Sequence, residues 1–76
     1  MQSRISIDPA VCHGKPVIRS TRVLVSNILS DLAAGLTFDQ IIENYPSLTK
    51  QDIKAALKFG SELARFERLP VEAGSR

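Results

Sequence analysis

Three lysines and a glutamine lie close together in the C-terminal half of the sequence, in an arrangement typical of a DNA-binding helix. Lys50, Lys54 and Lys58 are spaced at i, i+4 and i+8, so on one helix they form a single basic line. Thr49 and Gln51 fall in the same first turn. Gln can bind adenine through two hydrogen bonds and Lys can bind guanine, so these side chains could read base edges. The same spacing also fits a solvated face opposite an apolar one, and both interpretations remain open.

Catalytic and metal-binding patterns are weak in this chain. Asp39 and Glu43 are spaced at i, i+4, but no third ligand, nucleophile or histidine accompanies them. Cys12 and His13 are the only Cys and His, and two neighbours cannot supply the roughly four ligands that a structural zinc requires. The sequence GKP at residues 14–16 lacks the Ser or Thr of a phosphate-binding loop. We therefore predict no enzymatic activity, no small-molecule substrate, no metal and no cofactor.

Length and composition restrict the chain to one small domain. A chain of 76 residues buries only about 60% of the surface that its unfolded form exposes. A single cysteine excludes an internal disulfide, and 43% hydrophobic residues favour self-association as the source of extra stability, so we expect a homodimer. The net charge of +2 is compatible with nucleic acid without requiring it. The lone cysteine and the lack of a signal-peptide or membrane-length apolar run predict a cytoplasmic protein with no membrane partner.

Apolar periodicity and capping residues predict three helices, over residues 24–34, 38–44 and 50–68. Gly35 is expected to end the first helix in a left-handed conformation, which costs glycine little. The second and third helices should each begin at a capping box. The capping pairs are Thr37 with Gln40 and Thr49 with Asp52. The predicted apolar faces consist of Val25, Ile28, Leu29, Leu32 and Ala33, then Phe38, Ile41 and Ile42, then Ile53, Ala56, Leu57, Gly60 and Ala64.

The residues before the first helix predict a β extension over residues 4–23. Ile5 and Ile7 alternate with polar neighbours, and residues 17–23 are rich in β-branched side chains. Two strands alone are not stable in water, so they need a helix beneath them, more strands, or the same strands from a second copy. We expect the last of these, with the strands pairing across a two-fold axis of an intertwined homodimer. The residues assigned to dimer contact are Ile5, Ile7, Val17, Ile18 and Val23.

The second and third predicted helices are joined by four residues, 45–48, which is the layout of a helix-turn-helix. In such units the first turn of the second helix enters the major groove. The predicted fold class is therefore mainly α: one helix-turn-helix domain over residues 1–68, with a short two-strand N-terminal extension and a flexible tail over 69–76. The residues assigned to DNA contact are Thr49, Lys50, Gln51, Lys54 and Lys58, with Arg19 and Arg22 as flanking charges that contact the DNA backbone or pair across the dimer.

The runs IDPAVCHGKPVIRSTRVLV and LAAGLTFDQIIENYPSLTKQDIKAAL resemble the small bacterial proteins of domain-of-unknown-function family 433 (DUF433), over about residues 5 to 58. Ser20 and Leu24 depart from that pattern, where the family usually has glycine and proline. Glycine would permit an unusual backbone angle at position 20, whereas Leu24 only removes a rigid helix start. The resemblance implies a homeodomain-like helix-turn-helix and an antitoxin of the VapB type, encoded beside a PIN-like ribonuclease toxin.

This resemblance implies an antitoxin of a type II toxin–antitoxin pair, which binds its PIN-like toxin directly and represses its own transcription by binding operator DNA. PIN-type nucleases hold a divalent metal with clustered carboxylates, and an inserted arginine would exclude metal or RNA. Residues 59–71 have the apolar and arginine content of such an arm, although packing on the chain's own core explains them equally well. The residues assigned to toxin contact are Phe59, Leu63, Arg65, Phe66, Arg68 and Leu69.

Two other functions remain open from the sequence. The chain could be a free-standing helix-turn-helix transcription regulator without a toxin. It could also be a dimeric protein-interaction module whose helix-turn-helix does not bind DNA.

Overall fold

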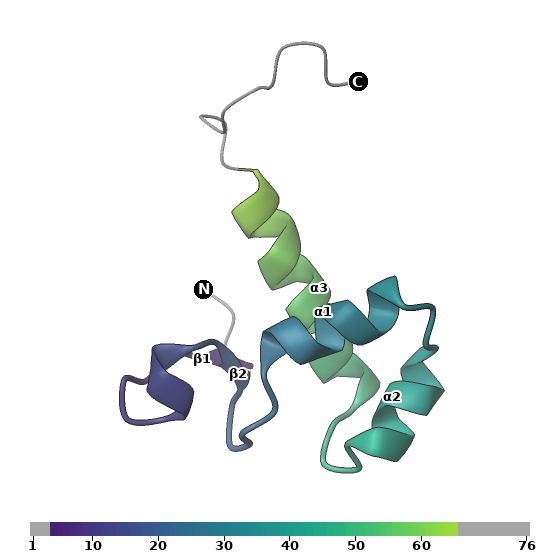
Figure 1. Cartoon of the computed structure of the whole chain (residues 1–76), viewed down its shortest axis with the longest axis horizontal. Helices are drawn as coiled ribbons and strands as arrows, with labels where there is room; N and C mark the ends of the chain where they lie inside the picture. Colours follow the sequence, from purple (N-terminus) through teal and green to yellow (C-terminus); the bar gives the residue numbers. More distant parts are fainter. Residues whose placement is uncertain (1–3, 66–76) are drawn as a thin grey trace.

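The computed structural model describes residues 4–65, in which two very short strands precede three helices (Figure 1). The predicted mainly α fold, with three helices and a two-strand N-terminal extension, is confirmed. In Figure 1, α1 and α2 lie beside the N-terminal part of α3, and the C-terminal end of α3 projects away from them. The elements are β1 (Ile5–Ser6), the 3-10 turn η1 (Cys12–Gly14), β2 (Val17–Ile18), α1 (Val25–Ala33), α2 (Phe38–Asn44) and α3 (Lys50–Ala64).

Both predicted capping boxes are present, and they fix where α2 and α3 begin. At α2 the Thr37 side chain accepts the Gln40 N–H, while the Gln40 side chain accepts the Thr37 N–H. At α3, Thr49 and Asp52 make the same reciprocal pair of hydrogen bonds. Each pair satisfies two backbone N–H groups that the first turn of a helix leaves without intrahelical partners.

The helix ends follow the expected signals, except in α3. Gly35 ends α1 with φ at +97°, and the N–H groups of Gly35 and Leu36 bond to carbonyls of the last turn. These two bonds form the Schellman arrangement, which favours glycine at this position. The third helix ends at Ala64 with Arg65 as its C-cap, earlier than the predicted residue 68. Residues 66–76, including the predicted tail, lie outside the described residues.

The β extension is shorter than the sequence predicts. β1 and β2 are antiparallel, with Ile5 opposite Ile18 and Ser6 opposite Val17. On the other side of β2, Val17 forms a β-bridge with Leu24. The extended segment predicted over residues 17–23 is therefore interrupted, because the chain must reverse direction to bring Leu24 beside Val17.

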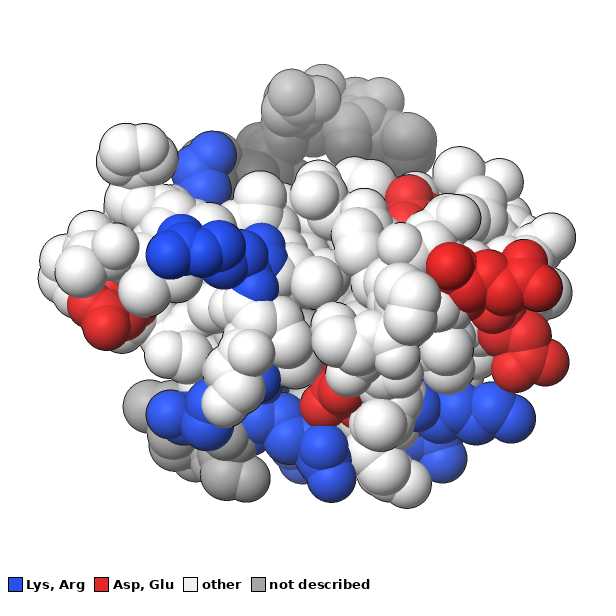
Figure 2. All heavy atoms as spheres, turned by 90° about the horizontal axis from the view of Figure 1, so that it is seen from below, with Lys and Arg blue, Asp and Glu red and all other residues white. Residues whose placement is uncertain are grey.

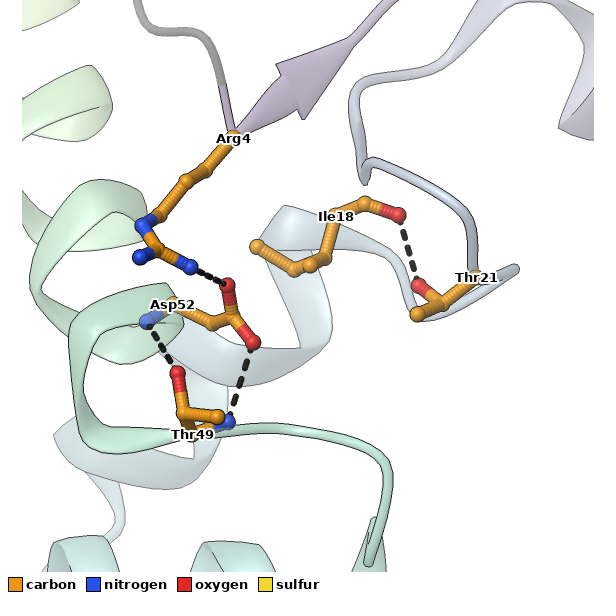
Figure 3. Close-up of polar contacts among 5 residues, drawn as sticks. All are labelled: Arg4, Ile18, Thr21, Thr49 and Asp52. Atoms are coloured by element: carbon orange, nitrogen blue, oxygen red, sulfur yellow. Dashed lines mark hydrogen bonds and ion pairs between the residues drawn. The ribbon is translucent and has the colours of Figure 1, made fainter.

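A tight turn over residues 19–22 makes this reversal. Ser20 has a left-handed φ of +67°. The hydroxyl of Thr21 donates to the Ile18 carbonyl at 2.7 Å (Figure 3) and accepts the Val23 N–H at 3.0 Å. A threonine hydroxyl can thus offer the backbone local partners that compete with a strand ladder. The β-branched composition of this segment does not reveal that competition.

The loop between the strands contains three consecutive left-handed residues. Cys12, His13 and Gly14 have φ values of +50°, +58° and +81°. The sequence predicts such a conformation only for Gly14. Each non-glycine residue in this region costs about 1–2 kcal/mol. The Cys12 thiol makes a weak contact with the Arg22 carbonyl, with Sγ 3.9 Å from the oxygen, so this loop contacts the 19–22 turn.

The core lies between the three helices and the strands. Ile28, Ile41 and Ile53 are completely buried, one from each helix, and Ile5 and Ile18 belong to the same cluster. The strands therefore cover part of α1–α3 within a single chain. Leu57 is 42% exposed, and Ala33 and Ala64 are exposed as well, although the sequence places all three on apolar faces.

Most residues assigned to dimer contact are buried within the chain itself. Ile5, Val17 and Ile18 are 2–3% exposed, and Val23 is half-buried against the core. Ile7 is the exception among the residues assigned to dimer contact, because it is 57% exposed. The strands gain their apolar cover from the helices, which is one of the possibilities that the strand pattern leaves open.

Candidate nucleic-acid interface

The start of α3 presents the side chains that the sequence assigns to base contact. The opposite face of the helix is buried, because Ile53 and Ala56 are 0% exposed. The Thr49 hydroxyl already accepts the Asp52 N–H at 3.2 Å, so Thr49 acts as the cap of this helix. Lysine and glutamine side chains therefore dominate the surface of the first turns. The exposed residues here are Thr49, Lys50, Gln51, Lys54 and Lys58.

A buried residue anchors the turn between α2 and α3. Leu48 is 3% exposed, and its N–H donates to the Tyr45 carbonyl at 2.9 Å. Tyr45 packs partly against the core as the C-cap of α2. The turn is thus held from inside, which fixes the position of α3 relative to α2.

One exposed ion pair links these two helices. Lys50 Nζ lies 3.8 Å from Asp39 Oδ1, with the two side chains 64% and 83% exposed. Exposed pairs of this kind contribute about 0–1 kcal/mol, so Lys50 can exchange Asp39 for another anion at little cost. Glu43 is exposed on the same helix as Asp39.

The 19–22 turn contributes two arginines to the surface of the molecule. Arg19 and Arg22 are exposed, and Arg19 Nη2 also donates to the Ile5 carbonyl at 3.2 Å. In Figure 1 the 19–22 turn and the α2–α3 turn both lie at the lower edge. Figure 2 is seen from below and shows Lys and Arg side chains along the lower part of the view and at its left, with acidic side chains at the right and also among the basic ones at the left and lower centre. The two turns that precede or carry the predicted DNA-contact residues therefore lie at the same edge of the molecule in Figure 1.

An ion pair that the sequence does not predict connects the N-terminus to α3 (Figure 3). Arg4 Nη1 lies 3.0 Å from Asp52 Oδ1, and Asp52 is 7% exposed. The other carboxylate oxygen, Oδ2, accepts the Thr49 N–H at 2.9 Å. The sequence assigns Asp52 to the cap but gives Arg4 no role, because no periodicity relates residues 48 positions apart.

The residues assigned to toxin contact divide into three groups. Phe59 is half-buried and packs against the core, as the alternative interpretation expects. Leu63 is 58% exposed and Arg65 is exposed, on the part of α3 that projects from the other helices (Figure 1). Phe66, Arg68 and Leu69 lie outside the described residues.

Other kinds of site have little support in residues 4–65. Within this range, His, Cys, Asp and Glu side chains do not gather in groups of three that could hold a metal ion. Cys12 is a free, half-buried thiol beside an exposed His13. None of the helices described has the length and apolar character needed to cross a membrane.

Comparison with known proteins gives the family. The uncharacterized protein y4eO of Sinorhizobium fredii (strain NBRC 101917 / NGR234) is 35% identical over 52 residues, which cover 68% of this chain and 24% of that protein. A crystal structure of a DUF433 member from Anabaena variabilis matches with a TM-score of 0.75 and 34% identity, over 80% of this chain and 60% of that chain. The chain thus spans about a quarter of the first relative and 60% of the second. The family model described as "Protein of unknown function (DUF433)" matches residues 5–60, and the chain therefore belongs to the DUF433 family.

Proposed function

We propose that this chain is the antitoxin of a type II toxin–antitoxin pair, which binds operator DNA through α3 and neutralises a PIN-like ribonuclease. The DNA-binding part rests on one observation: Lys50, Gln51 and Lys54 are exposed on the first turns of the second helix of a helix-turn-helix layout. In such units these positions contact base edges in the major groove. A homodimer would present two copies of α3 to a two-fold operator and so repress its own operon.

The basic side chains suit the phosphate backbone as well as the bases. Lysine and arginine that neutralise phosphates release counterions, so binding weakens as salt increases. Arg22 of the 19–22 turn and Lys58, one turn beyond Lys54 on α3, are also exposed. Exposed basic side chains of this kind can contact phosphates and so fix the orientation of a reading helix.

The DNA part is tested by fluorescence anisotropy with labelled duplex DNA from the region upstream of the chain's own gene. Replacing Lys50 and Lys54 together by Ala should weaken binding and lower the slope of log K against log salt by about two. Arg65→Ala removes one charge at the opposite end of α3 and should leave this slope unchanged. An unaltered slope for the double variant would show that α3 does not contact DNA.

The toxin part rests on the projecting end of α3. Leu63 combines 58% exposure with a neighbouring exposed Arg65, and an apolar anchor beside an arginine suits a partner with an acidic cleft. Residues 61–65 are all exposed, so a partner could surround this end without displacing the core.

Co-purification with the product of the neighbouring gene tests this contact. Leu63→Glu combined with Arg65→Glu should abolish co-purification. Lys58→Glu combined with Ser61→Glu changes the net charge by the same amount on the same exposed helix and should retain the partner. Retention by both variants would exclude the projecting end as the toxin contact.

The two assays also separate the alternatives. A free-standing transcription regulator would bind DNA and retain no nuclease partner. An interaction module would bind neither the upstream duplex nor a control duplex, at any salt concentration.

A further inference from the structure

Arg4 lies where the N-terminal strand meets the start of α3 (Figure 3). Its Nη1 atom donates to Asp52 Oδ1 at 3.0 Å, but its side chain remains 49% exposed. A guanidinium carries five N–H donors, and this bond uses one of them. Arg4 is therefore held in place at one side and accessible to solvent at the other.

Asp52 is a rigid support for this arginine. Its side chain is 9% exposed, and its second oxygen accepts the Thr49 N–H at 2.9 Å. The Asp52 N–H donates in turn to the Thr49 hydroxyl at 3.2 Å. Because the carboxylate cannot rotate without breaking the cap of α3, it fixes Arg4 beside the turn that carries Lys50 and Gln51.

The backbone of Arg4 also connects α3 to the 19–22 turn. Its carbonyl accepts the Arg19 N–H at 2.7 Å, and the Arg19 guanidinium donates to the next carbonyl, that of Ile5. The strand thus lies between the two segments proposed to contact DNA. The positive charge of Arg4 also compensates the negative charge of Asp52, which would otherwise repel phosphate close to the reading helix.

We propose that Arg4 binds a backbone phosphate of duplex DNA beside the groove that α3 enters, and that Asp52 is the residue that positions it. This inference rests on the proposed DNA binding by α3. The planar guanidinium matches the oxygens of a phosphate, and such contacts fix the orientation of a protein on the duplex. The contact would set the depth and angle of α3 in the groove without reading sequence.

The salt dependence of binding to a labelled duplex of about 20 base pairs, between about 50 and 200 mM salt, tests the contact. Arg4→Gln should lower the slope of log K against log salt by about 0.9, and weaken binding roughly tenfold near 0.1 M salt. Arg4→Lys should restore most of the slope, because lysine keeps the charge. Arg65→Gln, with the same loss of charge on the projecting end of α3, should leave it unchanged.

The role of Asp52 is tested by a double-mutant cycle in the same assay. Asp52→Asn keeps an oxygen for the cap but removes the charge that holds Arg4. In the Asp52→Asn background, Arg4→Gln should then lower the slope by less than half as much as it does in the unaltered protein. If the two residues acted independently, Arg4→Gln would lower the slope equally in both backgrounds. An equal effect in both backgrounds would show that Asp52 does not position Arg4.

The double variant Arg4→Gln with Asp52→Asn is a control for misfolding of the single variants. It leaves no unpaired charge at the cap and retains the original net charge. Its slope should still be lower than that of the unaltered protein. If the unaltered protein binds duplex DNA and the Arg4 variants keep its slope, this inference is wrong and the proposed function stands. If the unaltered protein does not bind duplex DNA at any salt concentration, both are wrong.

Discussion

Gly60 of α3 lies directly against Leu29 of α1: a methyl group on Gly60 would be 3.1 Å from Leu29 Cδ1. This glycine allows the two helices to approach closely, immediately before the exposed residues 61–65 begin. The contact therefore marks where the packed part of α3 ends and its projecting part starts.

Gly60→Ala should stabilise the protein modestly. Alanine in a helix interior is favoured over glycine by about 1 kcal/mol, and the half-buried Leu29 side chain can move by the few tenths of an ångström required. We expect a net gain of about 0.5 kcal/mol, measured by urea denaturation. Gly35→Ala is the matched control: it meets no atom within 4 Å, but its φ of +97° should make it destabilising by about 1 kcal/mol. A loss from Gly60→Ala would show that Leu29 is held rigidly.

Asp52→Ala should cost more stability than Gln40→Ala. Both residues occupy the third position of a capping box, but Asp52 also pairs with Arg4 and is buried. Loss of a cap contact costs about 1 kcal/mol, and an unpaired Arg4 should raise the total to about 2 kcal/mol for Asp52→Ala. Thermal and urea unfolding of both variants measure the difference. Equal losses would mean that the ion pair contributes nothing to stability.

Ser20→Gly should stabilise the 19–22 turn. Ser20 has a φ of +67°, where a residue with a Cβ atom is strained and glycine is not. Relief of about 1 kcal/mol is partly offset by the greater freedom of glycine in the unfolded chain, so we expect a gain of a few tenths of a kcal/mol. Ser20→Val places a β-branched residue at this angle and should lower the free energy of unfolding by about 1 kcal/mol. Urea midpoints of the three proteins should therefore follow the order Gly, Ser, Val.

Leu24→Pro should leave α1 intact. Leu24 precedes α1 with φ at −72°, close to the angle that proline imposes, and within residues 4–65 its N–H donates no backbone hydrogen bond. We expect a change of less than about 1 kcal/mol in the free energy of unfolding and an unaltered circular dichroism spectrum. Ser30→Pro, in the exposed interior of the same helix, should cost about 3 kcal/mol. A helix loss from Leu24→Pro would contradict the observed backbone angle.

The features that the sequence predicts correctly are local. The Thr49–Asp52 capping box and the left-handed Gly35 each depend on residues within one helical turn, so spacing and residue type suffice. The three helices follow from apolar periodicity for the same reason. The exposure of Lys50 and Lys54 could also be inferred, since both lie opposite the apolar face.

The features that the sequence does not reveal depend on contacts between distant segments or on backbone strain. Arg4 meets Asp52 across 48 positions, a relation that no periodic pattern contains. Ile5 and Ile18 of the strands pack against the helices, so these two residues, which the sequence assigns to dimer contact, belong to the core of the chain itself. Cys12 adopts a left-handed conformation that its residue type does not favour.

The attachment of β1 to α3 also has a consequence for the order of folding. Consecutive helices contact each other across short loops, whereas Arg4, next to β1, pairs with Asp52 across 48 positions. Local contacts form before such long-range closure, so we expect β1 to dock last and to detach first. The Arg19 amide, which donates to the Arg4 carbonyl, should therefore exchange its hydrogen faster than the Ile53 amide inside α3. Detachment of β1 would uncover Ile18, the pairing partner of Ile5, while the helices stay folded, so we expect partial opening and global unfolding of this small domain to be separate events.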